Sequence, residues 1–185
     1  KVNILKLKGE IVFKNVYFSY PKSKSWVLED ISFSVLPGEF LGITGPVGSG
    51  KTTLVSLIPR LFDISKGEIF IDDIQIKKIP LEVLRKNIGF VPQDSFLFSD
   101  TIANNIKFGN PNISDEKVKE LIKIVALEED LKEFPNGLDT IIGERGVTLS
   151  GGQKQRICLA RALAIDPPIL ILDDALSAVD VNTEK

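Results

Sequence analysis

The sequence predicts an α/β fold in which a helical segment interrupts a mixed core, and three observations predict it. Strand-like and helix-like segments alternate at both ends of the chain. Helical patterns dominate between residues 81 and 137. Near the C-terminus, residues 169–172 (ILIL) form a continuous apolar run, which is typical of a strand covered on both faces.

The composition is that of an ordinary globular domain, since 43% of the 185 residues are hydrophobic and 26% are charged. This length suffices for one domain with a substantial core. The net charge of -2 argues against a nucleic-acid partner, whose binding proteins usually carry a strongly basic face. No apolar run reaches the roughly 18 residues that cross a bilayer, and no signal-peptide core follows Lys1.

Three residue types limit the chemistry. Cys158 is the one cysteine of the chain, so an internal disulfide is excluded and a reducing compartment is expected. Its helical context predicts a small buried apolar group, with a reactive thiol as the alternative. The chain has no methionine, so we expect a segment of a longer protein. It has no histidine, so catalysis must use carboxylates, Lys51, hydroxyls and backbone groups.

The first half of the chain predicts strands and short helices in turn. Residues 10–20 are rich in β-branched and aromatic side chains and predict a strand that ends at Pro21. Residues 31–36 predict a second strand, and residues 40–44 a short apolar strand that leads into glycines. The next predicted elements are a helix at residues 52–61, a strand at 67–71, a helix at 81–86 and a strand at 88–91.

The second half predicts two longer helices and one strand. Residues 114–127 begin with a capping serine and two acids and show the 3.6-residue period of a helix. A second helix is expected from about residue 150 to 164, followed by the strand at 169–172. Residues 182–185 read as the start of a further helix.

Residues 45–52 (GPVGSGKT) match the phosphate-loop pattern G-x-x-x-x-G-K-[ST]. Its glycines allow backbone N–H groups to converge on one point, and the following helix adds the positive end of its dipole. Lys51 can reach the terminal phosphates of a nucleotide, and the Thr52 hydroxyl can bind Mg²⁺. The alternative is a flexible turn with a solvated lysine, which the complete pattern and its context disfavour.

A phosphate-loop enzyme also needs a carboxylate at the end of a neighbouring strand, directed at the metal. Asp173 follows the apolar run at 169–172, and ligands of such sheets gather at the carboxyl ends of the strands. Asp173 is therefore the predicted Mg²⁺ ligand. The alternative is an acidic cap of the next segment.

Residues 149–156 (LSGGQKQR) resemble the signature of ABC transporter nucleotide-binding domains. A serine and two glycines at a helix N-terminus form a second anion site, and one ATP does not need two phosphate cradles in one chain. The resemblance implies that the signature of one domain closes over the ATP held by another. The expected partner is therefore a second nucleotide-binding domain, arranged head to tail with two ATPs at the interface.

Further matches follow the order of that family. Tyr20 resembles the aromatic residue that stacks on adenine, with a place in the core as the alternative. Gln93 resembles the Q-loop glutamine, which senses the metal and contacts the membrane domain, and residues 177–180 (SAVD) resemble the D-loop. Residues 97–109 and 143–146 are similar to those of exporters with fused membrane domains.

The resemblance implies a phosphate-loop NTPase core with an N-terminal antiparallel β subdomain and a helical subdomain insertion, in a single domain truncated at its C-terminus. The core would take residues 1–85 and 155–185, and the helical subdomain about 86–154. The implied cofactors are ATP and Mg²⁺. Catalytic roles fall to Asp174, Gln93 and Lys51, and metal binding to Thr52, Gln93 and Asp173. The implied nucleotide-binding residues are Tyr20, Gly45, Pro46, Val47, Gly48, Ser49, Gly50, Lys51, Thr52, Thr53, Ser150, Gly151, Gly152 and Gln153.

The chain departs from the family pattern after Asp173, where a glutamate that polarises the attacking water is expected. Asp174 is one methylene shorter, and displacing a base by about 1 Å can cost on the order of a hundredfold in rate. We therefore expect slow hydrolysis at this site. Similar substitutions occur in heterodimeric ABC exporters, so the resemblance implies the Asp-bearing half of a heterodimeric multidrug-type exporter, with a homodimer as the alternative. The family's switch histidine would lie beyond Lys185.

The expected function is an ATPase domain that powers export through ATP-driven dimerisation, at the cytoplasmic face of the cell membrane and in contact with transmembrane domains. One alternative is a soluble ABC ATPase of the DNA-repair or translation type, without membrane partners. A second is a regulatory domain that binds ATP and scarcely hydrolyses it. A third, an unrelated phosphate-loop kinase or GTPase, is disfavoured by the signature.

Overall fold

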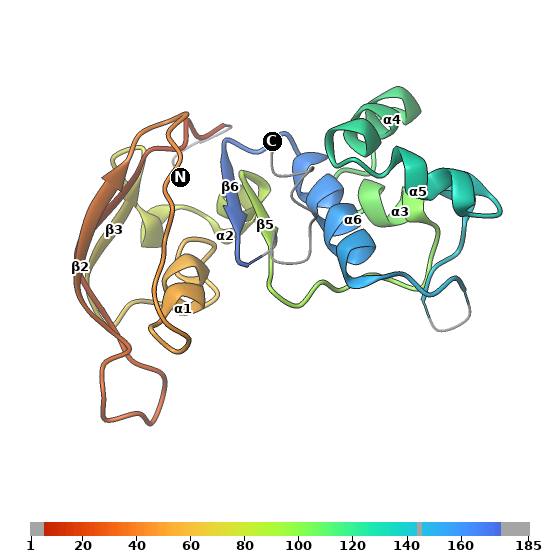
Figure 1. Cartoon of the computed structure of the whole chain (residues 1–185). Helices are drawn as coiled ribbons and strands as arrows, with labels where there is room; N and C mark the ends of the chain where they lie inside the picture. Colours follow the sequence, from red (N-terminus) through yellow and green to blue (C-terminus); the bar gives the residue numbers. More distant parts are fainter. Residues whose placement is uncertain (1–5, 144–145, 175–185) are drawn as a thin grey trace. The chain divides into compact units, whose positions relative to one another are not determined.

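The computed structural model describes residues 6–143 and 146–174. The chain divides into two compact units, Lys1–Ile88 and Gly89–Lys185, and each is described by itself (Figure 1).

The first unit is built on a four-stranded sheet with the order β2-β1-β3-β4. The strands are β1 (Ile11–Phe18), β2 (Leu28–Val35), β3 (Lys66–Ile71) and β4 (Ile74–Gln75). All three pairings are antiparallel, so the antiparallel sheet expected in the N-terminal part is present. The predicted strands at residues 10–20, 31–36 and 67–71 are therefore confirmed, with ends that differ by up to three residues.

One irregularity in β1 sets which side chains face the core. Phe13 and Val16 are both buried although three positions separate them, because the pairing register shifts between them and Asn15 has φ 46°. On the neighbouring strand, Gly67 has φ 84°, and a Cβ built there would lie 2.2 Å from the Asn15 carbonyl oxygen. This close approach requires glycine.

Short helices pack beside this sheet: α1 (Lys51–Ser56), η1 (Ile76–Lys78) and α2 (Leu81–Lys86). Helix α2 has the predicted bounds, but α1 ends five residues before the predicted end at residue 61. The residue that precedes Pro59 is biased away from helical geometry, and Arg60 has φ 51°. The Arg85 guanidinium then donates hydrogen bonds to the carbonyls of Pro59 and Arg60, both at 3.0 Å, and holds the turn that ends the helical path.

The predicted strand at residues 40–44 is wrong. These residues belong to no strand, and Phe40 is 93% exposed. A strand requires a neighbour that accepts and donates its backbone hydrogen bonds, and this segment forms no ladder with β1 to β4.

The second unit combines a two-stranded sheet with a helical cluster. Strand β5 (Ile88–Val91) pairs with β6 (Ile169–Leu172), and both have the predicted bounds. The helices are α3 (Ile102–Lys107), α4 (Asp115–Ile124), α5 (Glu128–Glu133), η2 (Gly137–Asp139) and α6 (Gly151–Leu163). Their shared core includes Ile106, Leu121, Leu127, Ile142 and Ile157.

Two of these helices, α4 and α6, confirm predictions, and the other three were not predicted. Helix α4 begins after its Ser114 cap as expected and ends three residues early, just before Ala126 takes φ 52°. Helix α6 follows its Ser150 cap and matches the predicted span within one residue. The helices that were not predicted are short, with six residues each in α3 and α5 and three in η2.

Cys158 is buried on α6, as predicted. Burial raises the pKa of its thiol, so the thiolate form that reacts is disfavoured. Within residues 6–143 and 146–174, no helix has the length and apolar character needed to cross a bilayer.

Candidate functional site

The predicted phosphate loop lies in the first unit and leads into α1. Gly48 and Gly50 have φ of 81° and 91°, a region that side chains rarely adopt. A Cβ on Gly50 would also lie 3.0 Å from Leu28 of β2, so the loop needs glycine there for its backbone angle and for its packing. No side chain caps α1 at Gly50, so the first N–H groups of the helix point out of its end.

Lys51 is the first residue of α1, and its ammonium group folds back over the loop. It donates hydrogen bonds to the carbonyl oxygens of Gly45 at 2.8 Å and Pro46 at 3.0 Å. Both acceptors are neutral, whereas a phosphate oxygen would form a stronger, charge-assisted bond. The lysine is therefore placed at the loop by local contacts and can exchange them for an anion.

Tyr20 lies beside the same helix, although 25 positions separate it from the start of the phosphate loop. Its hydroxyl is 2.8 Å from the Thr53 hydroxyl, one of the predicted nucleotide-binding residues. The ring meets Phe18 and Phe62 edge to face, with centroids 5.0 and 5.3 Å apart, and remains 38% exposed. The structure thus brings Tyr20 to the loop's helix with part of its ring accessible.

In the second unit, the ends of β5 and β6 bring together three of the predicted metal and catalytic residues, whereas Lys51 and Thr52 belong to α1 of the first unit. The Asp173 N–H donates to the Val91 carbonyl at 2.9 Å, so the two strands end at the same edge. Asp173 is 8% exposed. Gln93 follows β5 by two positions, and its Nε2 lies 3.5 Å from Oδ2 of Asp174, which adopts φ 52°. Gln93, Asp173 and Asp174 therefore form one cluster.

The chemistry of these side chains fits Mg²⁺. The predicted ligands are the Thr52 hydroxyl, the Gln93 amide oxygen and the Asp173 carboxylate, all hard oxygen donors. In the part of the chain that the structure describes, no group of three or more His, Cys, Asp and Glu side chains forms a metal-sized cluster. Mg²⁺ does not require one, because it is usually held by one or two carboxylates together with phosphates and water.

The signature turn, residues 150–153, forms the N-terminus of α6. The Ser150 Oγ accepts the Gln153 N–H at 3.2 Å, and the Gln153 Oε1 accepts the Ser150 N–H at 2.9 Å, which is a complete capping box. Ser150 and Gly151 are exposed, whereas Gly152 and Gln153 are half-buried. The turn thus presents a hydroxyl and the end of a 13-residue helix to solvent.

Sequence reasoning missed the residues that hold the segment after Gln93. Asn105, which is buried, binds Phe98 through both backbone groups, accepting its N–H at 2.9 Å and donating to its carbonyl at 3.0 Å. Arg161 of α6 donates to the carbonyls of Phe96 and Asn105 at 2.9 and 2.8 Å. Burial lowers the pKa of Arg161. These residues lie outside the motifs, so only their tertiary contacts identify them.

This segment carries exposed aromatic rings. The rings of Phe96 and Phe98 meet edge to face with their centroids 5.1 Å apart, and the ring centroids of Phe98 and Phe108 are 4.4 Å apart. Phe96 is 65% exposed and Phe108 62%. The Arg161 guanidinium lies 5.4 Å from the Phe98 ring centre. We call Phe96, Phe98 and Phe108 the aromatic patch; clustered exposed rings of this kind mark interaction surfaces.

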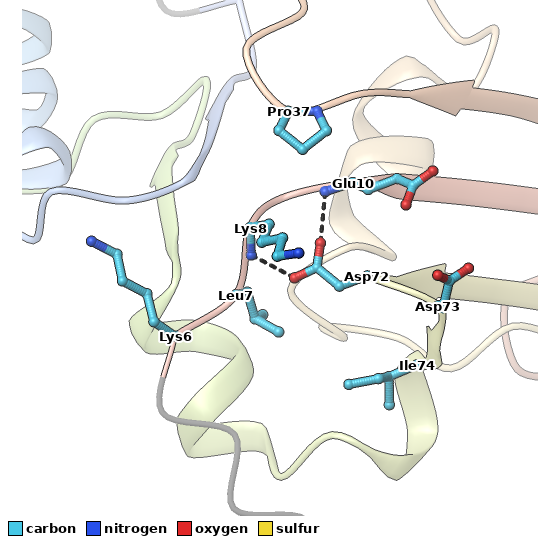
Figure 2. Close-up of a pocket in the computed structure, with 8 residues that line it drawn as sticks. All are labelled: Lys6, Leu7, Lys8, Glu10, Pro37, Asp72, Asp73 and Ile74. Atoms are coloured by element: carbon cyan, nitrogen blue, oxygen red, sulfur yellow. Dashed lines mark hydrogen bonds between the residues drawn. The ribbon is translucent and has the colours of Figure 1, made fainter.

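A separate pocket in the first unit has a structural explanation. Figure 2 shows it beside the turn between β3 and β4, where the Asp72 carboxylate accepts the backbone N–H groups of Lys8 and Glu10. The N–H of Gly9 adds a third bond at 3.0 Å. The carboxylate thereby ties the residues before β1 to the hairpin, and no predicted site residue lines the pocket.

Some predicted features lie outside the described residues. The D-loop at residues 177–180 is one, and Glu144 and Arg145 of the 143–146 run are others. The neighbouring Gly143 and Gly146 are described. A Cβ on Gly146 would lie 2.2 Å from the Ile141 carbonyl oxygen, so this position requires glycine.

Comparison with known proteins gives a consistent result. The family model described as "ABC transporter" matches residues 28–177. The multidrug resistance-like ATP-binding protein MdlA of Escherichia coli (strain K12) is 49% identical over 177 residues, which cover 96% of this chain and 30% of that protein. The probable multidrug resistance ABC transporter ATP-binding/permease protein YheI of Bacillus subtilis (strain 168) is 51% identical over 180 residues, or 97% of this chain and 31% of that protein.

A solved structure described as a bacterial Atm1-family ABC exporter with ATP bound has a TM-score of 0.89 to this chain and 41% sequence identity. It covers 95% of this chain and 31% of the other. The chain thus spans about a third of the length of the proteins it matches.

Proposed function

Because this chain belongs to the ABC transporter family, we propose that it is the nucleotide-binding domain of an exporter and that it binds ATP with Mg²⁺. The observation that carries the proposal is the placement of the three motifs. The phosphate loop leads into α1, the acidic cluster ends β6, and the signature turn begins α6. Each motif lies where its proposed chemistry requires a strand end or a helix N-terminus.

In the proposed site, residues 45–53 hold the phosphates and the exposed ring of Tyr20 stacks on adenine. Lys51 exchanges its bonds to the Gly45 and Pro46 carbonyls for phosphate oxygens. Thr52, Gln93 and Asp173 are the proposed Mg²⁺ ligands. The ion would neutralise charge on the phosphates during transfer, and the protein contributes mainly positioning and electrostatic stabilisation.

The signature turn has a separate role in the proposal. Its Ser150 hydroxyl and helix N-terminus are exposed and suited to an anion. We assign them to the ATP held by a second nucleotide-binding domain in a head-to-tail dimer. Two such contacts close the dimer when ATP is bound, and hydrolysis opens it.

Hydrolysis at this chain's own site is proposed to be slow. The Asp174 carboxylate takes the position of the water-polarising base, and it is the shorter of the two acidic side chains. The Gln93 amide lies 3.5 Å from it, at the outer limit of a hydrogen bond. We therefore propose the Asp-bearing half of a heterodimeric multidrug-type exporter, in which the intact signature turn serves the partner's faster site.

The surface near Gln93 is proposed to contact the transmembrane domains at the cytoplasmic face of the cell membrane. Phe96 and Phe98 of the aromatic patch follow Gln93 within five positions, and their backbone is held by Asn105 and Arg161. Aromatic residues and arginine are both enriched at protein interfaces. The net charge of -2 argues against a nucleic-acid partner.

Nucleotide binding by the complete protein that carries this domain tests the proposal. Lys51→Ala should weaken ATP binding at least tenfold, because it removes charge-assisted bonds worth about 1.5–3 kcal/mol. Lys77→Ala, an exposed lysine of η1, is the matched control and should bind ATP as the unmodified protein does. Equal affinities for all three proteins, or no measurable ATP binding with Mg²⁺, would refute the proposal.

A further inference from the structure

The signature turn is fixed by a carboxylate outside its own helix. Asp130 lies on α5, 23 positions before Gln153, and its Oδ1 accepts the Gln153 side-chain N–H at 2.7 Å. Its Oδ2 accepts a guanidinium N–H of Arg156 at 2.8 Å. The Arg156 and Asp130 side chains are 13% and 20% exposed, so solvent screens this pair only partly.

The Gln153 amide is engaged at both ends. Its oxygen accepts the Ser150 N–H within the capping box, and its nitrogen donates to Asp130. A continuous chain of hydrogen bonds therefore runs from the Ser150 backbone to α5. Without Asp130, the Gln153 side-chain N–H would lose its acceptor. The orientation of Ser150 would then depend on the capping box of α6 alone.

The charges of this group balance. A lone carboxylate next to the signature turn would repel an approaching phosphate, but Arg156 neutralises Asp130 at 2.8 Å. The other acids in the first turn of α5, Glu128 and Glu129, are exposed. Asp130 can thus hold the turn without opposing an anion there.

Helix α5 contributes little to the core, where Leu131 is its one side chain among those packed against the core cluster of the described residues. None of its own residues is buried. Its links to α6 through Asp130 are polar and charge-assisted, which gives them a defined direction. The main effect of Asp130 is therefore to orient the signature turn through directional hydrogen bonds, and it buries little apolar surface.

We propose that Asp130 is a positioning residue for ATP-driven closure: through Gln153 and Arg156 it fixes the orientation in which the signature turn meets the nucleotide of the facing domain. This inference rests on the proposed function. It assigns to a residue outside every motif a role that acts in the dimer and not in the first binding of ATP to the phosphate loop.

The test uses the complete protein with Asp130→Ala, Asp130→Asn and a control, Glu129→Ala. Glu129 lies on the same helix and pairs with Lys132 at 2.6 Å in solvent. Asp130→Ala should leave the affinity for a fluorescent ATP analogue without Mg²⁺ unchanged, and raise the ATP concentration for half-maximal turnover about tenfold, as expected for lost charge-assisted hydrogen bonds. Asp130→Asn keeps an acceptor for Gln153 and should recover part of the loss. Glu129→Ala should match the unmodified protein.

A double-mutant cycle with Ser150→Ala separates positioning from stability. If Asp130 acts through the signature turn, Asp130→Ala should add little to the defect of Ser150→Ala. Additive defects, a normal half-maximal concentration for Asp130→Ala, or an equal defect in Glu129→Ala would overturn the proposal. A lower melting temperature with no change in that concentration would also overturn it. If the unmodified protein itself does not bind the ATP analogue, the proposed function is refuted instead.

Discussion

Replacing Asp174 by glutamate tests the proposed slow hydrolysis most directly. The substitution extends the carboxylate by one methylene, a C–C bond of about 1.5 Å. Since a displacement of about 1 Å can change a rate about a hundredfold, the full gain corresponds to about 2.7 kcal/mol of activation free energy.

The backbone reduces this gain. Asp174 has φ 52°, a region that aspartate enters more readily than glutamate. Backbone movement that relieves this strain displaces the longer carboxylate from its best position, and a loss of about 1 kcal/mol of the gain leaves about 1.7 kcal/mol. We therefore expect single-turnover hydrolysis of radiolabelled ATP to become about twentyfold faster in the Asp174→Glu protein.

Two controls complete this experiment. Asp174→Asn retains the size of the side chain but cannot accept a proton, and it should hydrolyse ATP more slowly than the unmodified protein. Adding Lys51→Ala to Asp174→Glu should abolish the gain, which assigns it to this chain's own site. If Asp174→Glu binds ATP normally in the assembled protein and turns over no faster, the length of this side chain does not limit hydrolysis.

Three further predictions concern the nucleotide, the fold and the pH dependence. Tyr20→Phe should keep ATP affinity within about threefold and Tyr20→Ala should lose about tenfold, since stacking on a base is worth about 1–3 kcal/mol; equal losses in a binding titration would contradict the stacking role. Gly67→Ala should lower the free energy of unfolding by more than about 3 kcal/mol, because its Cβ would lie 2.2 Å from the Asn15 carbonyl and φ is 84°; a denaturant midpoint like that of the unmodified protein would contradict this. Hydrogen bonds from Asn104 and the Thr101 N–H lower the pKa of Asp100 from its ordinary value, so their contribution to stability should be present above that ordinary value and lost as the pH falls through the lowered pKa; Asn104→Ala should flatten this acid dependence in thermal melts, and an unchanged dependence would exclude the bond.

The sequence predicts the elements whose ends are marked chemically. Strand β5 stops at Pro92, β6 ends at two acids, and helices α4 and α6 each follow a serine cap. These signals are local, because proline removes a donor and serine caps the first turn of its own helix. Bounds set in this way need no knowledge of the tertiary structure.

Elements stabilised by distant contacts were missed or mistaken. Helix α3 has only six residues and is held by the buried Asn105 side chain, which bonds to Phe98 and to the Thr101 carbonyl. Residues 40–44 have the apolar pattern of a strand, but pattern alone does not supply a neighbour to pair with. The same limit applies to Asp130, which stands in an acidic run with the appearance of a solvated helix face.

The same distinction between local signals and distant contacts applies to the candidate site. Motifs identified the residues proposed to touch ATP, because phosphate binding demands glycines, a lysine and helix ends in fixed order. The residues that hold those motifs carry no such pattern. Arg85 fixes the end of the helical path after α1, and Asp130 fixes the signature turn. Their contacts are with backbone carbonyls and side chains far along the chain, so many sequences could provide them.

Helix α6 connects two features that the sequence presents separately. It begins at the signature turn after Ser150, and near its other end Arg161 binds the Phe96 carbonyl beside the aromatic patch. Its 13 residues span roughly 20 Å at about 1.5 Å per residue. Between these two ends, Ile157 of α6 belongs to the same core cluster as Ile106 and Leu121, so the helix is anchored in the core along its length. The proposed nucleotide contact and the proposed membrane contact therefore lie near opposite ends of one helix.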